Sequence, residues 1–190
     1  TSAPLARQFS VDEYHRMIET AILTTNDRVQ LIDGWIIEMP SIGPEHITSN
    51  SLVGSTVQSC LPSGWVVRFQ GPITLTNSEP EPDVVVVRGT LRDYAKRHPG
   101  SGDIAIVIEV ADSTLKFDRV QKAATYAAAG IPEYWIVNLV DRQLEVHRDP
   151  QTMASGSEYR VREVVDASGT VALTIDGQQI APIKVADLLP

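Results

Sequence analysis

Short continuous runs of apolar residues, rather than alternating apolar and polar residues, mark the middle of this chain. Residues 84–87 and 104–110 follow this pattern, and the second run carries one acid, Glu109, near its end. A strand without alternation is typically buried on both faces. We therefore predict two central strands of a sheet, one of which holds a carboxylate that needs a cation, a donor network or a proton.

A helix is predicted directly after the second of these strands. It begins near Ser113 or Thr114, either of which can cap free backbone N–H groups, and it ends at Gly130 with Pro132 just beyond. At about 100° per residue, one apolar arc of this helix comprises Phe117, Val120, Ala124, Ala127 and Ala128.

Lys122 falls outside this arc, together with Asp118 and Thr125. Two interpretations stay open for the lysine: it is solvated, or it faces a cleft that Glu109 also reaches. Asp118 lies one turn before Lys122 and can form an i, i+4 pair with it that contributes a few tenths of a kcal/mol.

The remaining patterns alternate between strand and helix. Residues 28–32 and 35–39 predict a hairpin around Asp33-Gly34, and residues 44–61 predict a second helix. Further strands are predicted at residues 65–69, 72–75, 134–140 and 144–147. This order predicts an α/β fold with a central sheet flanked by helices and an extra N-terminal hairpin.

Length and composition favour one domain, residues 1–190, because 43% hydrophobic residues can form a substantial core. The longest apolar runs are far shorter than the ~20 residues of a membrane-spanning helix, and no basic-then-apolar leader opens the chain. The single Cys60 fits a reducing compartment. We therefore expect a soluble cytoplasmic protein that does not bind a membrane.

The formal net charge of −8 means that binding of nucleic acid would need a local basic patch. Candidate residues for such a patch are Arg88, Arg92, Lys96, Arg97 and His98, followed by Lys116, Arg119 and Lys122. An ordinary solvated face explains this loose cluster equally well.

Asp83 introduces the run 84–87 in the way that Glu109 closes the run 104–110. Alone, an aspartate after a proline is a turn or cap residue. Together, the two acids abut buried strands that can lie side by side, and a divalent cation would relieve the repulsion between them. Hard oxygen ligands suit Mg²⁺, and Mn²⁺ is the alternative.

His46 lies in the first turn of the predicted helix 44–61. A histidine at this position is a capping or surface group more often than a ligand or a base, so its catalytic role is the minority interpretation.

The motifs now described resemble the Uma family of endonucleases, a branch of the PD-(D/E)XK nuclease superfamily. The likeness comprises Pro82-Asp83, IEVADST around Glu109, FDRVQK with Asp118 and Lys122, GIPEYWIV, and also RVQLIDG, GPEH and VADLL. It covers nearly the whole chain, and its most specific part runs from Glu109 to the end of GIPEYWIV.

The resemblance implies a restriction-endonuclease-like fold in which Asp83 and Glu109 bind the metal and Lys122 orients or activates the attacking water. Two positions depart from the pattern. Ala111 stands where the superfamily usually has its lysine, so the amine must come from the helix, and Gln30 stands where an acid is expected in the first hairpin.

The sequence leaves three alternative functions open. The first is a metal-dependent endonuclease that hydrolyses phosphodiester bonds of nucleic acid, with DNA as the first expectation. The second is a nuclease-fold module that binds nucleic acid or a protein without cutting. The third is purely structural, with Asp83 as a turn cap and Glu109 as a buried, hydrogen-bonded acid. A homodimer is also predicted, because Tyr134-Trp135 and the strands from Leu144 onward offer apolar area.

Overall fold

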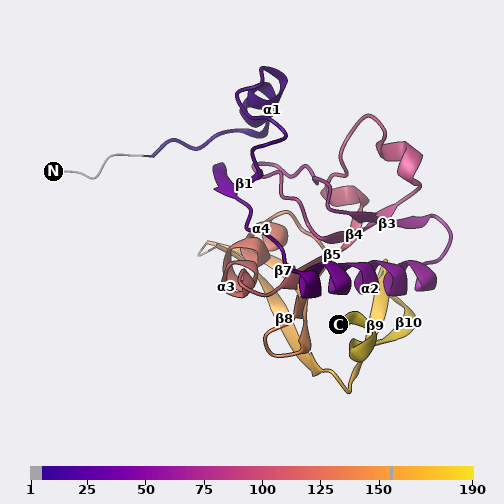
Figure 1. Ribbon diagram of the computed structural model, residues 1–190. Helices are drawn as coiled ribbons and strands as arrows, with labels where there is room; N and C mark the ends of the chain where they lie inside the picture. The colour runs from indigo at the N-terminus through magenta and orange to yellow at the C-terminus, as the bar shows by residue number, and fades with distance from the viewer. Residues whose placement is uncertain (1–5, 155) are drawn as a thin grey trace.

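A six-stranded mixed sheet forms the centre of the fold (Figure 1). The structure, a computed structural model, describes residues 6–154 and 156–190. Strands β5 and β6 are parallel, and the other neighbouring pairs are antiparallel. In spatial order the strands are β3 (Trp65–Phe69), β4 (Val84–Arg88), β5 (Ile104–Ala111), β6 (Glu133–Asn138), β7 (Gln143–Met153) and β8 (Gly156–Asp166).

The two continuous apolar runs are the second and third strands of this sheet. All residues of β5 are buried, and so are the four valines of β4. Burial on both faces explains why neither run alternates. The prediction of an α/β fold with a central sheet flanked by helices is confirmed.

Helices cover both faces of the sheet. On one face, α2 (Pro44–Cys60) packs through Val53 and Val57. The other face is covered by one continuous helical stretch, which we call the third helical segment. It consists of α3 (Leu115–Phe117), a π-helical turn (Asp118–Lys122) and α4 (Ala123–Ala128). Helix α1 (Val11–Glu19) lies apart from the sheet, beside strand β1 (Figure 1). Within the described residues, no helix is both long and apolar enough to cross a membrane.

Two hairpins complete the fold. The predicted N-terminal hairpin is confirmed as β1 (Val29–Ile32) and β2 (Trp35–Glu38), with Asp33 and Gly34 at φ 48° and 79°, as a tight two-residue turn requires. The C-terminal hairpin is formed by β9 (Thr170–Ile175) and β10 (Gln178–Lys184). Short 3₁₀ helices span Leu91–Tyr94, Ser101–Asp103 and Val185–Leu188.

The strand predicted at residues 72–75 is absent from the described structure. Thr74 forms only an isolated bridge with Gly100. The neighbouring N–H groups of Ile73 and Leu75 donate to Pro80 and Ser78 of the same loop. The segment therefore closes on itself and buries its apolar side chains as a loop against the sheet.

The predicted apolar arc of the third helical segment is also wrong. Val120 is 64% exposed, whereas Lys122 is only 7% exposed. The π-helical turn adds a residue to one turn and so changes which side chains point inward. Tyr126, which the arc omitted, is fully buried.

The apolar area assigned to self-association at Tyr134-Trp135 does not exist on the surface. Both side chains are completely buried within the two core clusters of the sheet. Any contact between copies of the chain would have to use other residues.

Candidate active site

Asp83 stands at the entry of β4 and is held by groups from two other elements. Its Oδ2 accepts the backbone N–H of Val110 on β5 at 2.9 Å. Its Oδ1 accepts from His46 Nε2 at 2.9 Å and from Asn50 Nδ2 at 3.5 Å, both on α2. Because Val110 follows Glu109 directly, these bonds fix Asp83 beside Glu109.

Glu109 lies on the face of β5 that the third helical segment covers. Its Oε1 accepts from the Tyr126 hydroxyl at 2.7 Å and pairs with Lys122 Nζ at 2.9 Å. Burial raises the pKa of Glu109 to about 7, against the opposing charge of Lys122 and with added repulsion from Asp83 and Asp118. Near neutral pH, this carboxylate therefore holds a proton part of the time.

Lys122 closes the π-helical turn and sits between two carboxylates. Besides Glu109, it has Asp118 Oδ1 at 3.6 Å. Burial alone would lower the pKa of Lys122, but Glu109 and Asp118 raise it above its usual value. The lysine is thus a charged, buried donor, and π-helical turns are frequent at functional sites.

Asp118 is the second carboxylate beside Lys122 and lies in the same π-helical turn. Its Oδ2 accepts the Thr114 hydroxyl at 2.5 Å, whereas its buried Oδ1 has no hydrogen-bond partner within the described residues. Burial raises the pKa of Asp118, and Lys122 opposes that rise. Asp118 therefore orients Lys122.

Most of these groups line one cavity of about 930 Å³. Five of the six residues singled out in the sequence line it, namely Gln30, His46, Asp83, Glu109 and Lys122. The sixth, Asp118, is not part of the lining. The structure therefore brings together residues from β1, α2, β4, β5 and the π-helical turn.

Gln30 is 4% exposed and faces this cavity from β1. Its Oε1 accepts the backbone N–H of Glu81 at 3.3 Å. The position expected to hold an acid therefore lines the same cavity as Asp83 and Glu109, and a neutral amide occupies it.

Sequence reasoning missed two residues that hold the acids. Asn50 follows His46 by four positions, and both reach Asp83 from one face of α2. Tyr126 follows Lys122 by four positions, and both reach Glu109. Since side chains at i and i+4 share a helix face, the spacing was a usable signal for both.

His46 pairs with Asp83 instead of capping its helix with its side chain. Burial lowers the pKa of the imidazole, but the hydrogen bond and charge of Asp83, with Glu109 and Asp112 nearby, raise it overall. The raised pKa favours the charged form of His46, which pairs with Asp83.

The donor set suits a hard divalent cation. Asp83 and Glu109 offer carboxylate oxygens, which Mg²⁺ prefers, and three carboxylates face only one lysine when Asp118 is included. The residues that the structure describes contain no cluster of three His, Cys, Asp or Glu side chains placed to hold a metal ion. Asp83 and Glu109 are the residues that could hold a cation, with water or substrate oxygens in the rest of its shell.

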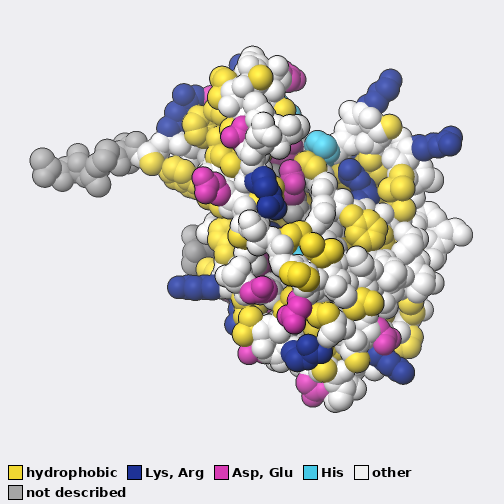
Figure 2. Space-filling view, viewed as in Figure 1, with side chains coloured by type: hydrophobic (Ala, Val, Ile, Leu, Met, Phe, Trp, Pro, Cys, Tyr) yellow, Lys and Arg dark blue, Asp and Glu magenta, His cyan; other side chains and the backbone are white. Residues whose placement is uncertain are grey.

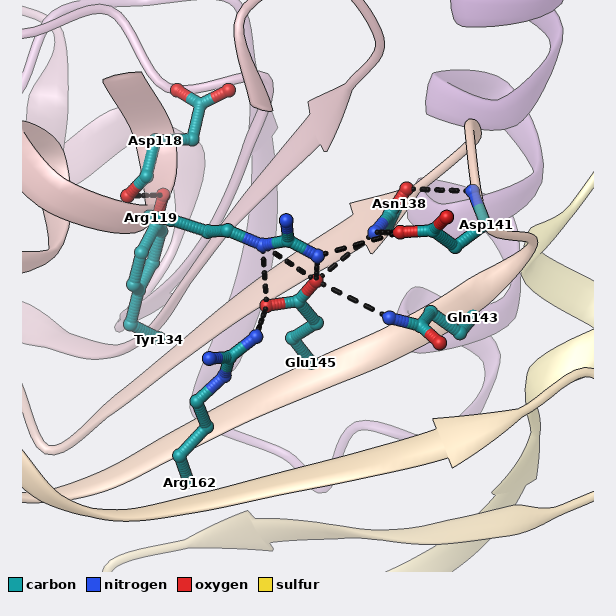
Figure 3. A network of polar contacts seen from close by, with 8 residues as sticks. All are labelled: Asp118, Arg119, Tyr134, Asn138, Asp141, Gln143, Glu145 and Arg162. Atoms are coloured by element: carbon teal, nitrogen blue, oxygen red, sulfur yellow. Dashed lines mark hydrogen bonds and ion pairs between the residues drawn. The ribbon is translucent and has the colours of Figure 1, made fainter. Parts of the chain in front are cut away.

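Another buried carboxylate, Glu145 on β7, is paired with two arginines (Figure 3). Burial raises its pKa, but hydrogen bonds from Arg119 and the charge of Arg162 lower it to about 2. In Figure 3, Arg119 reaches this network while the carboxylate of the adjacent Asp118 points away from it. Glu109, by contrast, pairs with one lysine and no arginine, and its pKa is raised rather than lowered.

Comparison with known proteins finds a matching family model and a solved structure of similar fold. The family model Uma2, described as "Putative restriction endonuclease", matches residues 11–182. A solved structure titled as a putative nuclease belonging to DUF820, from Anabaena variabilis, has a TM-score of 0.67 at 17% sequence identity, covering 95% of this chain and 97% of that one. The latter likeness shows a shared fold. Among curated proteins, none matches this chain.

Proposed function

The chain belongs to the Uma2 family of restriction-endonuclease-like proteins, and from this premise we propose that it is a divalent-metal-dependent endonuclease acting on nucleic acid. The observation that carries the proposal is that Asp83, Glu109 and Lys122 line one cavity, with Lys122 paired to Glu109 and Asp83 bonded to the backbone next to Glu109. Asp83 and Glu109 are the proposed metal ligands, and Lys122 is the proposed catalytic amine. One domain, residues 1–190, would carry this function in the cytoplasm, with DNA as the first expected substrate.

When bound, Mg²⁺ or Mn²⁺ would supply Lewis-acid stabilisation of the charge that develops on the phosphate. The protein's own groups do the positioning. His46 and Asn50 hold Asp83, and Tyr126 holds Glu109. Lys122 Nζ is a donor that can orient an attacking water or bind a phosphate oxygen as negative charge accumulates there.

A second candidate function is a nuclease-fold module that binds nucleic acid or a protein without cutting. The neutral Gln30 at the cavity favours it, because one negative charge fewer is available to hold a cation. The ion pair of Lys122 with Glu109 favours it too, since a cation would compete with the lysine for the same carboxylate.

The test is incubation of the purified protein with plasmid, single-stranded DNA and RNA, each with Mg²⁺, Mn²⁺ or a chelator. A nuclease cuts at least one substrate with a metal and none with the chelator. Binding without cutting under every metal condition would support the second function instead.

Gln30→Glu is expected to tighten Mg²⁺ binding about tenfold and to raise cleavage without changing the fold, because it adds a carboxylate oxygen to the site. The substituted carboxylate can still accept the N–H of Glu81. Calorimetric titration of Mg²⁺ and Mn²⁺ into both proteins measures the effect. Gln178→Glu, at an exposed position of β10, makes the same change in net charge and should leave affinity unchanged. Equal affinities in all three proteins would place Gln30 outside the metal site.

Self-association remains a prediction, and β8 is the element that supports it. This eleven-residue strand is an edge of the sheet, and Val161 and Val164 are 42% and 50% exposed. Exposed edge strands pair readily with other chains. Light scattering is expected to give a dimer mass for wild type and a monomer mass for Val164→Lys. A monomer mass for wild type across a wide concentration range would refute the dimer.

A further inference from the structure

Apolar side chains form a large part of the wall of the cavity around the proposed metal site, and the carboxylates of Asp27, Glu38 and Glu81 also line it. The apolar part of this wall is the basis of the inference. It includes Ile18, Leu23, Ile37, Met39, Ile42 and Phe117. These side chains come from α1 and the segment after it, from β2 and the loop before α2, and from α3. Contact with apolar side chains does not stabilise a charged phosphodiester group, whereas the faces of nucleobases are apolar and stack on aromatic rings.

Cations are scarce in this cavity. Of all lysines and arginines in the described chain, only Arg28 and Lys122 line it. Arg28 is exposed, and no ion pair or hydrogen bond of its side chain is found among the described residues. Its charge opposes the rise in the pKa of Glu81, which also lines the cavity, and its guanidinium is the second cation there that could bind a phosphate.

Four of the eight residues in the basic cluster suggested by the sequence are paired with acids, namely Arg88, Arg97, Arg119 and Lys122. Arg88 pairs with Asp176 at 2.9 Å and stacks on Trp65. Arg97 pairs with Asp103 and lies over the Tyr94 ring. On the face shown in Figure 2, lysines and arginines are scattered singly and do not gather into one patch. Strong binding of duplex DNA through its backbone requires many such contacts at once.

The size of the cavity agrees with a small occupant. At about 930 Å³ it lies within the range of pockets that enclose small organic ligands. In a duplex, base faces are stacked and only base edges are accessible. Base faces become available to a protein wall when the nucleotide is unpaired or is turned out of the stack.

We propose that this cavity binds an unpaired nucleotide, whose base rests against Phe117 and the surrounding aliphatic side chains while its phosphate lies at Asp83, Glu109 and Lys122. The juxtaposition of the apolar wall with the two carboxylates and the lysine carries this inference. Arg28 binds the neighbouring phosphate. The inference rests on the proposed nuclease function for its substrate class, and it predicts a preference for single-stranded or locally unpaired nucleic acid over intact duplex.

Fluorescence anisotropy tests the inference with one labelled oligonucleotide offered as single-stranded DNA, as RNA of the same sequence, as intact duplex, and as duplex with one mismatch. Ca²⁺ serves as the hard-oxygen cation, and gel analysis checks that the probes stay whole. Single strands are expected to bind at least about tenfold more tightly than the intact duplex, because base stacking is added to phosphate contact. Tight binding of the mismatched duplex would indicate that the bound nucleotide is extruded from a duplex. Tight binding of single strands alone would indicate that it belongs to a free single strand. Either result supports the proposal.

Phe117→Leu is expected to weaken single-strand binding about tenfold, because it removes the ring but keeps apolar volume. Val120→Ala, on the exposed side of the same helical segment, should bind like wild type. Equal or tighter binding of intact duplex, or no effect of Phe117→Leu, would overturn the inference. Metal-dependent cutting of duplex by a protein indifferent to Phe117 would overturn it while leaving the nuclease function intact. Binding of single strands that depends on the Phe117 ring, without any cutting, would support the inference and contradict the nuclease function.

Discussion

Glu109→Gln is expected to reduce metal-dependent cleavage by more than about 100-fold while the fold persists. The amide keeps the size of the side chain, and its oxygen can still accept from Tyr126 and Lys122. What it loses is the negative charge that would hold the cation. Initial rates with Mg²⁺ and Mn²⁺, together with circular dichroism of the variant, measure both parts of the expectation.

Glu158→Gln is the matched control, because Glu158 is an exposed glutamate on β8. It should cleave like wild type. Asp83→Asn should also abolish cleavage, but it places an NH₂ group among donors from Val110, His46 and Asn50, so it should cost about 1–3 kcal/mol of stability as well. Cleavage that persists in both Glu109→Gln and Asp83→Asn would indicate a contaminating nuclease or a different site.

The positions of the two acids could be predicted from the sequence because each acid lies at the end of a strand whose apolar run is easy to recognise. A carboxylate at the edge of a continuous apolar run stays near the sheet, and neighbouring strands bring two such edges together. Asp83 and Glu109 illustrate this, since the backbone of Val110 links them across β4 and β5. The hairpin at Asp33-Gly34 was equally accessible, since only that turn chemistry fits its positive φ angles.

The orientation of the third helical segment was not accessible in the same way. A count at about 100° per residue assumes a regular α-helix, and the turn at Asp118–Lys122 is π-helical. The interior position of Lys122 depends on two carboxylates that lie on different elements. Local periodicity placed Lys122 outside the apolar arc but could not decide whether it is solvated or faces a cleft with Glu109. The ion pair between Lys122 and Glu109 in the cavity decides for the cleft.

Lys122→Met is expected to destabilise the protein by about 3–5 kcal/mol near pH 8, because it leaves Glu109 and Asp118 buried without a cation. Both carboxyl groups already have pKa values raised by burial, and loss of the lysine raises them further. The folded state then binds more protons than the unfolded state, so stability falls as pH rises. The destabilisation should therefore be small near the unfolded pKa of 4.5 for Glu109 and grow as pH rises through and beyond about 7.

Urea unfolding of wild type and variant from about pH 5 to about pH 8 measures this difference. Lys116→Met removes an exposed lysine from the same helical segment and should change stability by no more than about 0.5 kcal/mol at any pH. Adding Glu109→Gln to Lys122→Met should restore part of the stability at high pH, because it removes one of the two uncompensated charges. A loss that does not vary with pH and is not relieved by the second substitution would mean that Lys122 contributes packing rather than charge. The two carboxylates would then be stabilised by Tyr126, Thr114 and their other donors alone.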